Sequence, residues 1–197
     1  MINTSKKLTG LFLLELKNRF KTIAGNDQLI DKNEFKNGLR INNNKISNRL
    51  FDLFDEDKSG FIDFEEFYGM MKKLVNADNQ SKIKFAFDLH DLDNNGYIDR
   101  SELKILIEES FHENNLDYDH SQIDLLVNEF FKRADIDKSG TIDFTEFLEA
   151  AKNYPDFING FTVNPIYWLI PDRYEKKDNL KVKRIKKTKL SDIQVQD

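Results

Sequence analysis

Apolar residues recur at helical spacing in short stretches along most of the chain, and polar stretches separate them. Leu13, Leu16 and Phe20 follow one another at intervals of three and four residues, which places them on one face of a helix. The chain has 17 Phe but only 8 Gly and 3 Pro, which favours helices around a phenylalanine-rich core. We predict an all-α protein with helices over about residues 11–22, 32–40, 46–54, 64–75, 81–90, 100–111, 121–134 and 144–152.

Three of the polar stretches share one twelve-residue pattern, at residues 55–66, 91–102 and 135–146. Each has Asp at positions 1, 3 and 9, Ser or Asn at 5, Gly at 6, Ile at 8 and Glu at 12. Ca²⁺ takes six to eight oxygens, and this spacing supplies them from positions 1, 3, 5, 7, 9 and 12. This pattern is the EF-hand calcium loop.

We therefore predict three calcium sites. A single acidic turn would usually be solvated surface, but three matches at every ligand position favour calcium. Position 7 contributes its backbone carbonyl, position 9 commonly acts through a water, and both oxygens of the Glu at position 12 bind. The predicted metal ligands are Asp55, Asp57, Ser59, Phe61, Asp63 and Glu66; Asp91, Asp93, Asn95, Tyr97, Asp99 and Glu102; and Asp135, Asp137, Ser139, Thr141, Asp143 and Glu146.

A fourth, incomplete copy lies upstream. Phe20 and Ile23 precede Ala24 at the spacing seen before the other loops, and residues 30–35 repeat the second half of the pattern. The loop at 24–34 is one residue short and lacks both a carboxylate at position 1 and a glycine at the turn. We predict that it binds no metal, or binds it poorly, and offers Ile30 as a strand partner to the next loop. The alternative is a non-standard site that uses Asn26, Asp27, Asp31 and Glu34.

The four loops are numbered here in chain order: loop 1 (24–34), loop 2 (55–66), loop 3 (91–102) and loop 4 (135–146). EF-hand units pair, so four helix–loop–helix units predict two lobes with short β pairing between loops. The short polar break at residues 76–80 suggests that the lobes lie close together, with Ser81 as a helix N-cap, and Asp119 or Ser121 caps a later helix. The predicted organisation is a polar lead (1–10), a degenerate first hand (11–45), hands two to four (46–76, 81–115 and 119–152), an apolar segment (153–172) and a basic flexible tail (173–197).

Charge separates the end of the chain from the rest. Residues 173–197 carry a net charge of +5 and the remainder carries −10, within a total of −5. Such a basic run can contact anionic lipid or an acidic partner, or can simply be a solvated tail; nucleic acid is not an expected partner. The preceding apolar segment, with Trp168, could fill a groove in its own chain, serve a partner, or cap the C-terminal lobe.

Several classes of function are excluded by what the sequence lacks. There is no Cys, so disulfides and thiolate metal sites are absent, and the three scattered His do not predict zinc. His90 is expected at a partly buried core position. No nucleophile–base set or phosphate-binding glycine loop is visible, so we expect no enzyme activity from this chain alone. No secretory signal or membrane-spanning run stands out, and residue 2 is Ile, not the Gly of an N-myristoylation start, so a cytoplasmic location is expected.

Over roughly residues 11–170 the chain resembles the EF-hand region of the calcium-regulated NADPH oxidases. The resemblance rests on residues 20–35 leading to Asp55 and on the long spacing between the third and fourth EF-hand units. It also rests on Tyr154-Pro155 followed by residues 167–169. It is more distantly similar to calmodulin and the calcineurin B-like proteins. In the oxidase family this region precedes haem, flavin and NADPH domains, and calcium lets it engage the dehydrogenase part. No such domain is visible in this sequence, so the resemblance implies either a regulatory piece or a free-standing sensor.

These observations predict a calcium sensor that changes conformation on binding Ca²⁺ and controls a target protein, with an NADPH oxidase-type enzyme as the first expectation. Two alternatives stay open at this point. One is a calcium buffer that binds without opening, and the other is a calcineurin B-like regulatory subunit of a phosphatase or kinase.

Overall fold

The helices predicted from the apolar pattern are present in the structure, a computed structural model that describes residues 10–113 and 117–154. Their ends lie within two residues of the predicted ones, and the all-α prediction is confirmed. The predicted lead up to residue 9, most of the apolar segment and the basic tail lie outside the described residues. The helices are α1 (Gly10–Ala24), α2 (Lys32–Leu39), α3 (Asn44–Phe54), α4 (Phe64–Asn76), α5 (Asn79–His90), α6 (Arg100–Glu113), α7 (His120–Ala134) and α8 (Phe144–Asn153).

The helices that follow the loops begin with one recurring arrangement of side chains. Asp63 is the N-cap of α4 and its Oδ1 accepts a hydrogen bond from the Glu66 N–H at 2.9 Å. The Glu66 carboxylate accepts in return from the Asp63 N–H at 3.1 Å. This reciprocal capping box satisfies two N–H groups that a helix start otherwise leaves unpaired. The same pair of bonds starts the other three helices of this kind, through Asp31 and Glu34, Asp99 and Glu102, and Asp143 and Glu146.

The predicted N-cap of α5 is wrong, and the structure decides between the two candidate N-caps of α7. Helix α5 begins at Asn79, two residues before the predicted start, and its N-cap is Asp78 rather than Ser81. The Ser81 N–H donates to Asp78 Oδ1 at 2.7 Å, and hydrogen bonds from Ser81 lower the pKa of Asp78. A carboxylate is at least as good a cap as a hydroxyl, so the earlier Asp begins the helix and shortens the break between the lobes. For α7, Asp119 is the N-cap.

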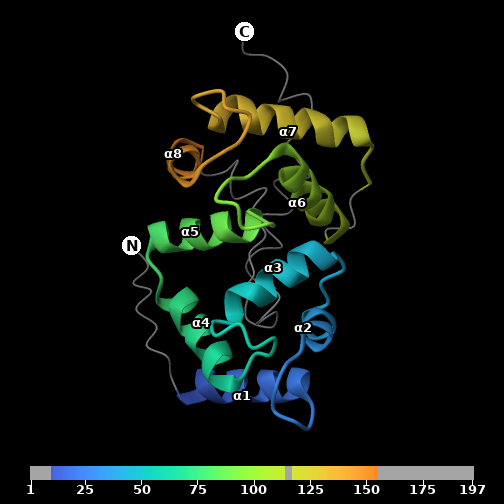
Figure 1. The fold of residues 1–197 in the computed structure, drawn as a ribbon, viewed down its shortest axis with the longest axis vertical. Helices are drawn as coiled ribbons and strands as arrows, with labels where there is room; N and C mark the ends of the chain where they lie inside the picture. Colours follow the sequence, from blue (N-terminus) through green and yellow to red (C-terminus); the bar gives the residue numbers. More distant parts are fainter. Residues whose placement is uncertain (1–9, 114–116, 155–197) are drawn as a thin grey trace.

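Helices α1–α4 form one lobe and α5–α8 form the other, in the lower and upper parts of Figure 1. In the N-terminal lobe α1 contacts α2 and α4, and in the C-terminal lobe α5 contacts α8 and α6 contacts α7. Each lobe is closed by one antiparallel bridge between its loops, Ile30 with Ile62 and Ile98 with Ile142. The N–H and C=O groups of each pair are bonded in both directions at 2.9 Å. The pairing predicted for Ile30 is therefore present.

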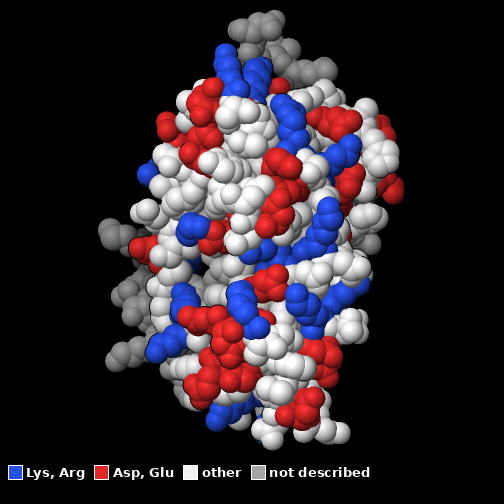
Figure 2. Space-filling view, in the orientation of Figure 1, with Lys and Arg blue, Asp and Glu red and all other residues white. Residues whose placement is uncertain are grey.

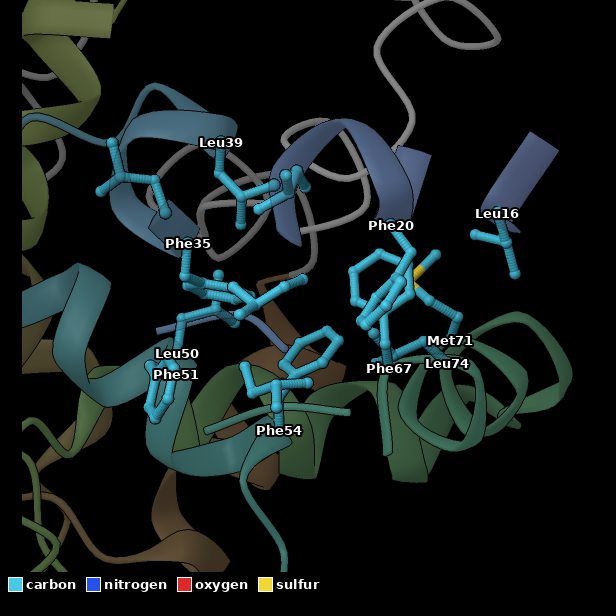
Figure 3. Packing of buried hydrophobic residues seen from close by; sticks show 14 of the residues in the cluster. Leu16, Phe20, Phe35, Leu39, Leu50, Phe51, Phe54, Phe67, Met71 and Leu74 are labelled. Atoms are coloured by element: carbon cyan, nitrogen blue, oxygen red, sulfur yellow. The ribbon is translucent and has the colours of Figure 1, made fainter. Parts of the chain in front are cut away.

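Phenylalanine rings fill the interior of the N-terminal lobe (Figure 3). Phe35 of α2 lies 5.6 Å from Phe51 and 5.5 Å from Phe54 between ring centroids. Phe54 in turn lies 5.8 Å from Phe67, which lies 5.6 Å from Phe20 of α1. These tilted and edge-on contacts suit the charge distribution of aromatic rings and connect all four helices of the lobe.

The two lobes share an apolar interface. Leu89 of α5 and Leu106 of α6 are fully buried and belong to the core of the N-terminal lobe. Helix α3 contacts α5 directly, as seen near the middle of Figure 1. His90 is 1% exposed and its ring lies 5.7 Å from that of Phe147 in the second core, where a core position was expected. Within residues 10–113 and 117–154, no helix is long and apolar enough to cross a membrane.

Close packing of α2 on α1 gives a first prediction. A Cβ on Gly38 would lie 2.7 Å from Ile23 Cγ1 and 2.8 Å from Cγ2, and an Arg19 guanidinium nitrogen donates to the Gly38 carbonyl at 2.7 Å. We expect Gly38→Ala to destabilise the metal-free protein by about 1–3 kcal/mol, because the branched Ile23 must move. Urea unfolding followed by circular dichroism measures this change.

Gly69, in the interior of α4, is the matched control because a Cβ there meets no atom within 4 Å. Gly69→Ala is expected to stabilise the protein by about 0.5–1 kcal/mol, since alanine loses less conformational entropy in a helix. Equal stability of Gly38→Ala and the parent would contradict the close approach of α1 and α2.

Candidate metal centres

Each of loops 2, 3 and 4 brings three carboxylates together at the junction of two helices. In every case one oxygen from each of positions 1, 3 and 12 lies within 4.8 Å of the others. Position 1 is also the C-cap of the helix before the loop, with its N–H donating to a carbonyl of the last turn at 2.9 Å. Position 12 lies in the first turn of the next helix. The three clusters are Asp55, Asp57 and Glu66; Asp91, Asp93 and Glu102; and Asp135, Asp137 and Glu146.

Backbone N–H groups hold the carboxylate at position 1. The Asp55 oxygens accept hydrogen bonds from the Ser59 and Gly60 N–H groups, both at 3.0 Å. Asp91 accepts from the residues at positions 5 and 6 of loop 3, both at 2.9 Å. Hydrogen bonds from Ser59 lower the pKa of Asp57, which favours the ionised form of this exposed carboxylate. The first half of the loop is thus folded around its own acids.

This fold requires two left-handed residues in each loop. The glycine at position 6 has φ of +87° in loop 2, +92° in loop 3 and +88° in loop 4. The residue at position 4 also has a positive φ of +59°, although it is not glycine: Lys58, Asn94 and Lys138. Of these two positions, only position 6 has the same residue in all three loops, because glycine adopts a positive φ without a steric penalty.

The glutamate at position 12 closes each loop. Glu66 Oε1 accepts from the N–H groups of Glu56 and Asp57 at 2.8 and 3.3 Å, while its Oε2 takes part in the capping box with Asp63. One carboxylate therefore joins the start of the loop to the start of the following helix. The same bonds are made by Glu102 and Glu146.

In loops 2 and 4 the side chain at position 5 lies next to the carbonyl at position 7. Ser59 Oγ donates to the Phe61 carbonyl at 3.0 Å, and Ser139 Oγ donates to the Thr141 carbonyl at 3.0 Å. The side chain of Phe61 is 46% exposed, which suits a residue predicted to contribute only its carbonyl. At position 9 the aspartates act as helix N-caps and are not part of the three-carboxylate clusters.

The electrostatics of the clusters fit a divalent cation. Burial raises the pKa of Glu102, and the nearby charge of Asp99 adds to this rise. Asp135 Oδ1 is shielded from solvent and has no hydrogen-bond partner among the described residues. A buried carboxylate oxygen without a partner is costly, and an oxygen-seeking cation would remove that cost. The face seen in Figure 2 carries interspersed acidic and basic side chains.

Loop 1 keeps the helix-start half of the arrangement and lacks the rest. The Glu34 N–H donates to Asp31 Oδ1 at 2.8 Å, while Asp27 Oδ1 accepts from the Leu29 N–H in a local turn at 3.0 Å. Gln28 has φ +64° at the turn where the other loops have glycine. In the part of the chain that the structure describes, Asp27, Asp31 and Glu34 form no carboxylate cluster like those of the other loops. An empty loop 1 stays a prediction.

One residue near the clusters was missed by the sequence reasoning. Arg49 of α3 reaches across the lobe interface and donates to Asn94 of loop 3 at 2.8 Å. An arginine within an amphipathic helix carries no signal of such a role, because its partners are supplied by the packing of the two lobes.

Comparison with known proteins places the chain in a family. Residues 80–152 match the family described as EF-hand domain pair, and residues 48–74 match EF hand domain. The chain is 33% identical to the calcineurin B protein of Schizosaccharomyces pombe, over 68% of this chain and 76% of that protein. It is 33% identical to calcineurin B-like protein 5 of Arabidopsis thaliana, over 79% of this chain and 76% of that protein. The chain belongs to the EF-hand calcium-binding family.

A third relative is much longer than this chain. Human NADPH oxidase 5 is 27% identical over 77% of this chain, but the matched part is only 23% of that protein. The resemblance to the EF-hand region of calcium-regulated NADPH oxidases and to calcineurin B-like proteins is thus confirmed. Family membership indicates calcium binding and a calcium-regulatory role.

Replacing position 12 in turn tests the ligand assignment. Because Gln can still form the capping box, Glu66→Gln, Glu102→Gln and Glu146→Gln should keep the helix starts while removing one ligand charge. We expect each variant to lower calcium affinity at its own loop at least about tenfold and the calorimetric stoichiometry to fall from three ions to two.

Glu34→Gln is the matched control, since Glu34 forms the same capping box in loop 1. It should leave the stoichiometry at three. Unaltered binding at loop 2 in Glu66→Gln would show that its ligand assignment is wrong, and loss of an ion in Glu34→Gln would show that loop 1 binds metal.

Proposed function

We propose that this chain is a calcium sensor that binds Ca²⁺ at loops 2, 3 and 4 and controls a target protein. The observation that carries the proposal is the position of each carboxylate cluster. Its first member ends one helix and its last member lies in the first turn of the next. An ion that draws these carboxylates together must act on both helices at once.

Bound calcium would neutralise the negative charge of the three converging carboxylates in each loop. In each loop the proposed ligands are those predicted from the sequence. Carboxylates at positions 1, 3 and 12 lie close together, and in loops 2 and 4 the side chain at position 5 is bonded to the carbonyl at position 7. The bonds that Glu66 makes to the start of loop 2 and to the cap of α4 already hold the loop near a binding shape. This limits the ordering that an ion must impose.

Apolar side chains at the edges of the cores provide the surface that such a change would uncover. Ile83, Phe111 and Phe144 are half-buried against the C-terminal core, and Phe64 and Tyr68 lie similarly in the N-terminal lobe. Phe144 is the first residue of α8, immediately after the aspartate at position 9 of loop 4. A change in the angle between α7 and α8 would therefore alter its exposure directly.

The target proposed is an enzyme of the NADPH oxidase type, engaged in a calcium-dependent way. The support is the similarity to NADPH oxidase 5 across 77% of this chain. The similarity to calcineurin B and calcineurin B-like proteins makes a phosphatase or a kinase the alternative target. In both cases this chain regulates and does not catalyse.

A calcium titration tests the sensor function. We expect the fluorescence of an apolar dye to rise between about 10⁻⁷ and 10⁻⁵ M free Ca²⁺, the range of sensor EF-hands. The triple variant Glu66→Gln, Glu102→Gln and Glu146→Gln should show no rise in this range. Tight binding in calorimetry without a dye response would instead identify a buffer.

Affinity capture with and without calcium tests the target. The immobilised chain should retain an oxidase dehydrogenase domain at about 10 μM Ca²⁺, the upper end of the sensor range, and release it in a calcium chelator, whereas the triple variant retains none. Calcium-dependent capture of a phosphatase catalytic subunit or a kinase, with no oxidase bound, would replace the proposed target by the alternative.

A further inference from the structure

We propose that Arg49 is a positioning residue that couples loop 3 in the C-terminal lobe to loop 2 in the N-terminal lobe. The proposal rests on the proposed function, because it concerns how two of the proposed calcium sites influence each other. Arg49 belongs to α3, yet both of its hydrogen-bond acceptors described here lie in the other lobe. Its Nε donates to the Asp88 carbonyl at 2.6 Å and a terminal guanidinium nitrogen donates to Asn94 Oδ1 at 2.8 Å.

The two acceptors lie on either side of the first ligand of loop 3. Asp88 is in the last turn of α5, three residues before Asp91, and Asn94 is at position 4, between the predicted ligands Asp93 and Asn95. The guanidinium therefore spans the end of the helix and the turn of the loop. Asn94 is also one of the left-handed residues, with φ +59°, so the bond holds the tightest part of the loop.

Burial makes this contact difficult to break. Arg49 is only 7% exposed, and a buried guanidinium keeps its charge and must retain acceptors. Hydrogen bonds from an ionised donor are stronger than those between neutral groups. If loop 3 or the end of α5 moves, the lowest-energy response is for Arg49, and with it α3, to follow.

Helix α3 carries that movement to loop 2. Arg49 lies six residues before Asp55, which is both the C-cap of α3 and the first member of the loop 2 cluster. The packing around Arg49 supports the transmission of movement from loop 3 to α3, because α3 contacts α5 and Leu89 of α5 is buried in the core of the N-terminal lobe. An ion that orders loop 3 would thus hold Asp55 in place for a second ion. We expect positive coupling between the two sites, and by linkage it is reciprocal.

A double-mutant cycle measures this coupling. Phe61→Trp with Trp168→Phe gives a parent whose only tryptophan reports on loop 2, since Trp168 is the single native one. In this parent, Glu102→Gln should lower the calcium affinity of loop 2 about fivefold or more. In the Arg49→Met background, the same Glu102→Gln change should alter that affinity by less than about twofold.

Two substitutions at position 4 keep the result interpretable if Arg49→Met folds poorly. Asn94→Gly removes the acceptor, and glycine accepts the left-handed conformation, so it should also reduce the coupling at least about twofold. Lys138→Gly makes the same change at the same position of loop 4, where φ is again +59°, and should leave the coupling intact.

The proposal is overturned if Glu102→Gln weakens loop 2 equally with and without Arg49, or if it has no effect on loop 2 in the parent. Failure of the proposed function gives a different result. Without calcium binding at loop 2, the parent itself would show no calcium-dependent change in tryptophan fluorescence, and a chain that binds without opening would keep that change but show no apolar-dye response.

Discussion

The carboxylate at the twelfth loop position is the group on which the rest of the structure depends. In loop 2, Glu66 accepts hydrogen bonds from the start of the loop through one oxygen and from the Asp63 N–H through the other. It therefore joins the start of the loop to the start of the following helix. Since the same group is a proposed calcium ligand, the bonds that build the hand and the bonds that would sense the ion involve the same atoms. In the proposed sensor, an ion bound at this group would act on both helices.

Loop 1 has the groups that build the hand but lacks the aspartate that begins the other loops. It retains the capping box of Asp31 and Glu34 and the bridge of Ile30 to Ile62, which the fold of the lobe needs. It has Ala24, fully buried, where the other loops begin with aspartate. A hand can thus lack the aspartate that begins the other loops while its helix start and its pairing strand persist, because capping and strand pairing stabilise the lobe without metal.

The interface between the lobes makes them one unit rather than two separate pairs. Leucines from α5 and α6 complete the core of the N-terminal lobe, and Arg49 places a buried charge against the end of α5. An apolar interface alone would allow sliding, whereas a guanidinium with two directed bonds favours one arrangement. This is the physical basis for expecting the two central sites, in loops 2 and 3, to influence each other.

The sequence by itself determined the eight helices of the part of the chain that the structure describes, the pairing of Ile30 and the spacing of the acids, because helical periodicity, capping chemistry and calcium coordination are all local rules. The predicted N-cap Ser81 was wrong. Asp78 and Ser81 could both cap α5, and the Asp78 carboxylate is the better acceptor. The sequence said nothing of the left-handed Gln28 and Lys58, since neither residue type signals that conformation. Only the tertiary structure decided that Asp135 Oδ1 is buried with no hydrogen-bond partner within residues 10–113 and 117–154, and that Arg49 contacts Asn94. The reason is that burial and contacts between lobes depend on residues far apart in the chain, which no local pattern records.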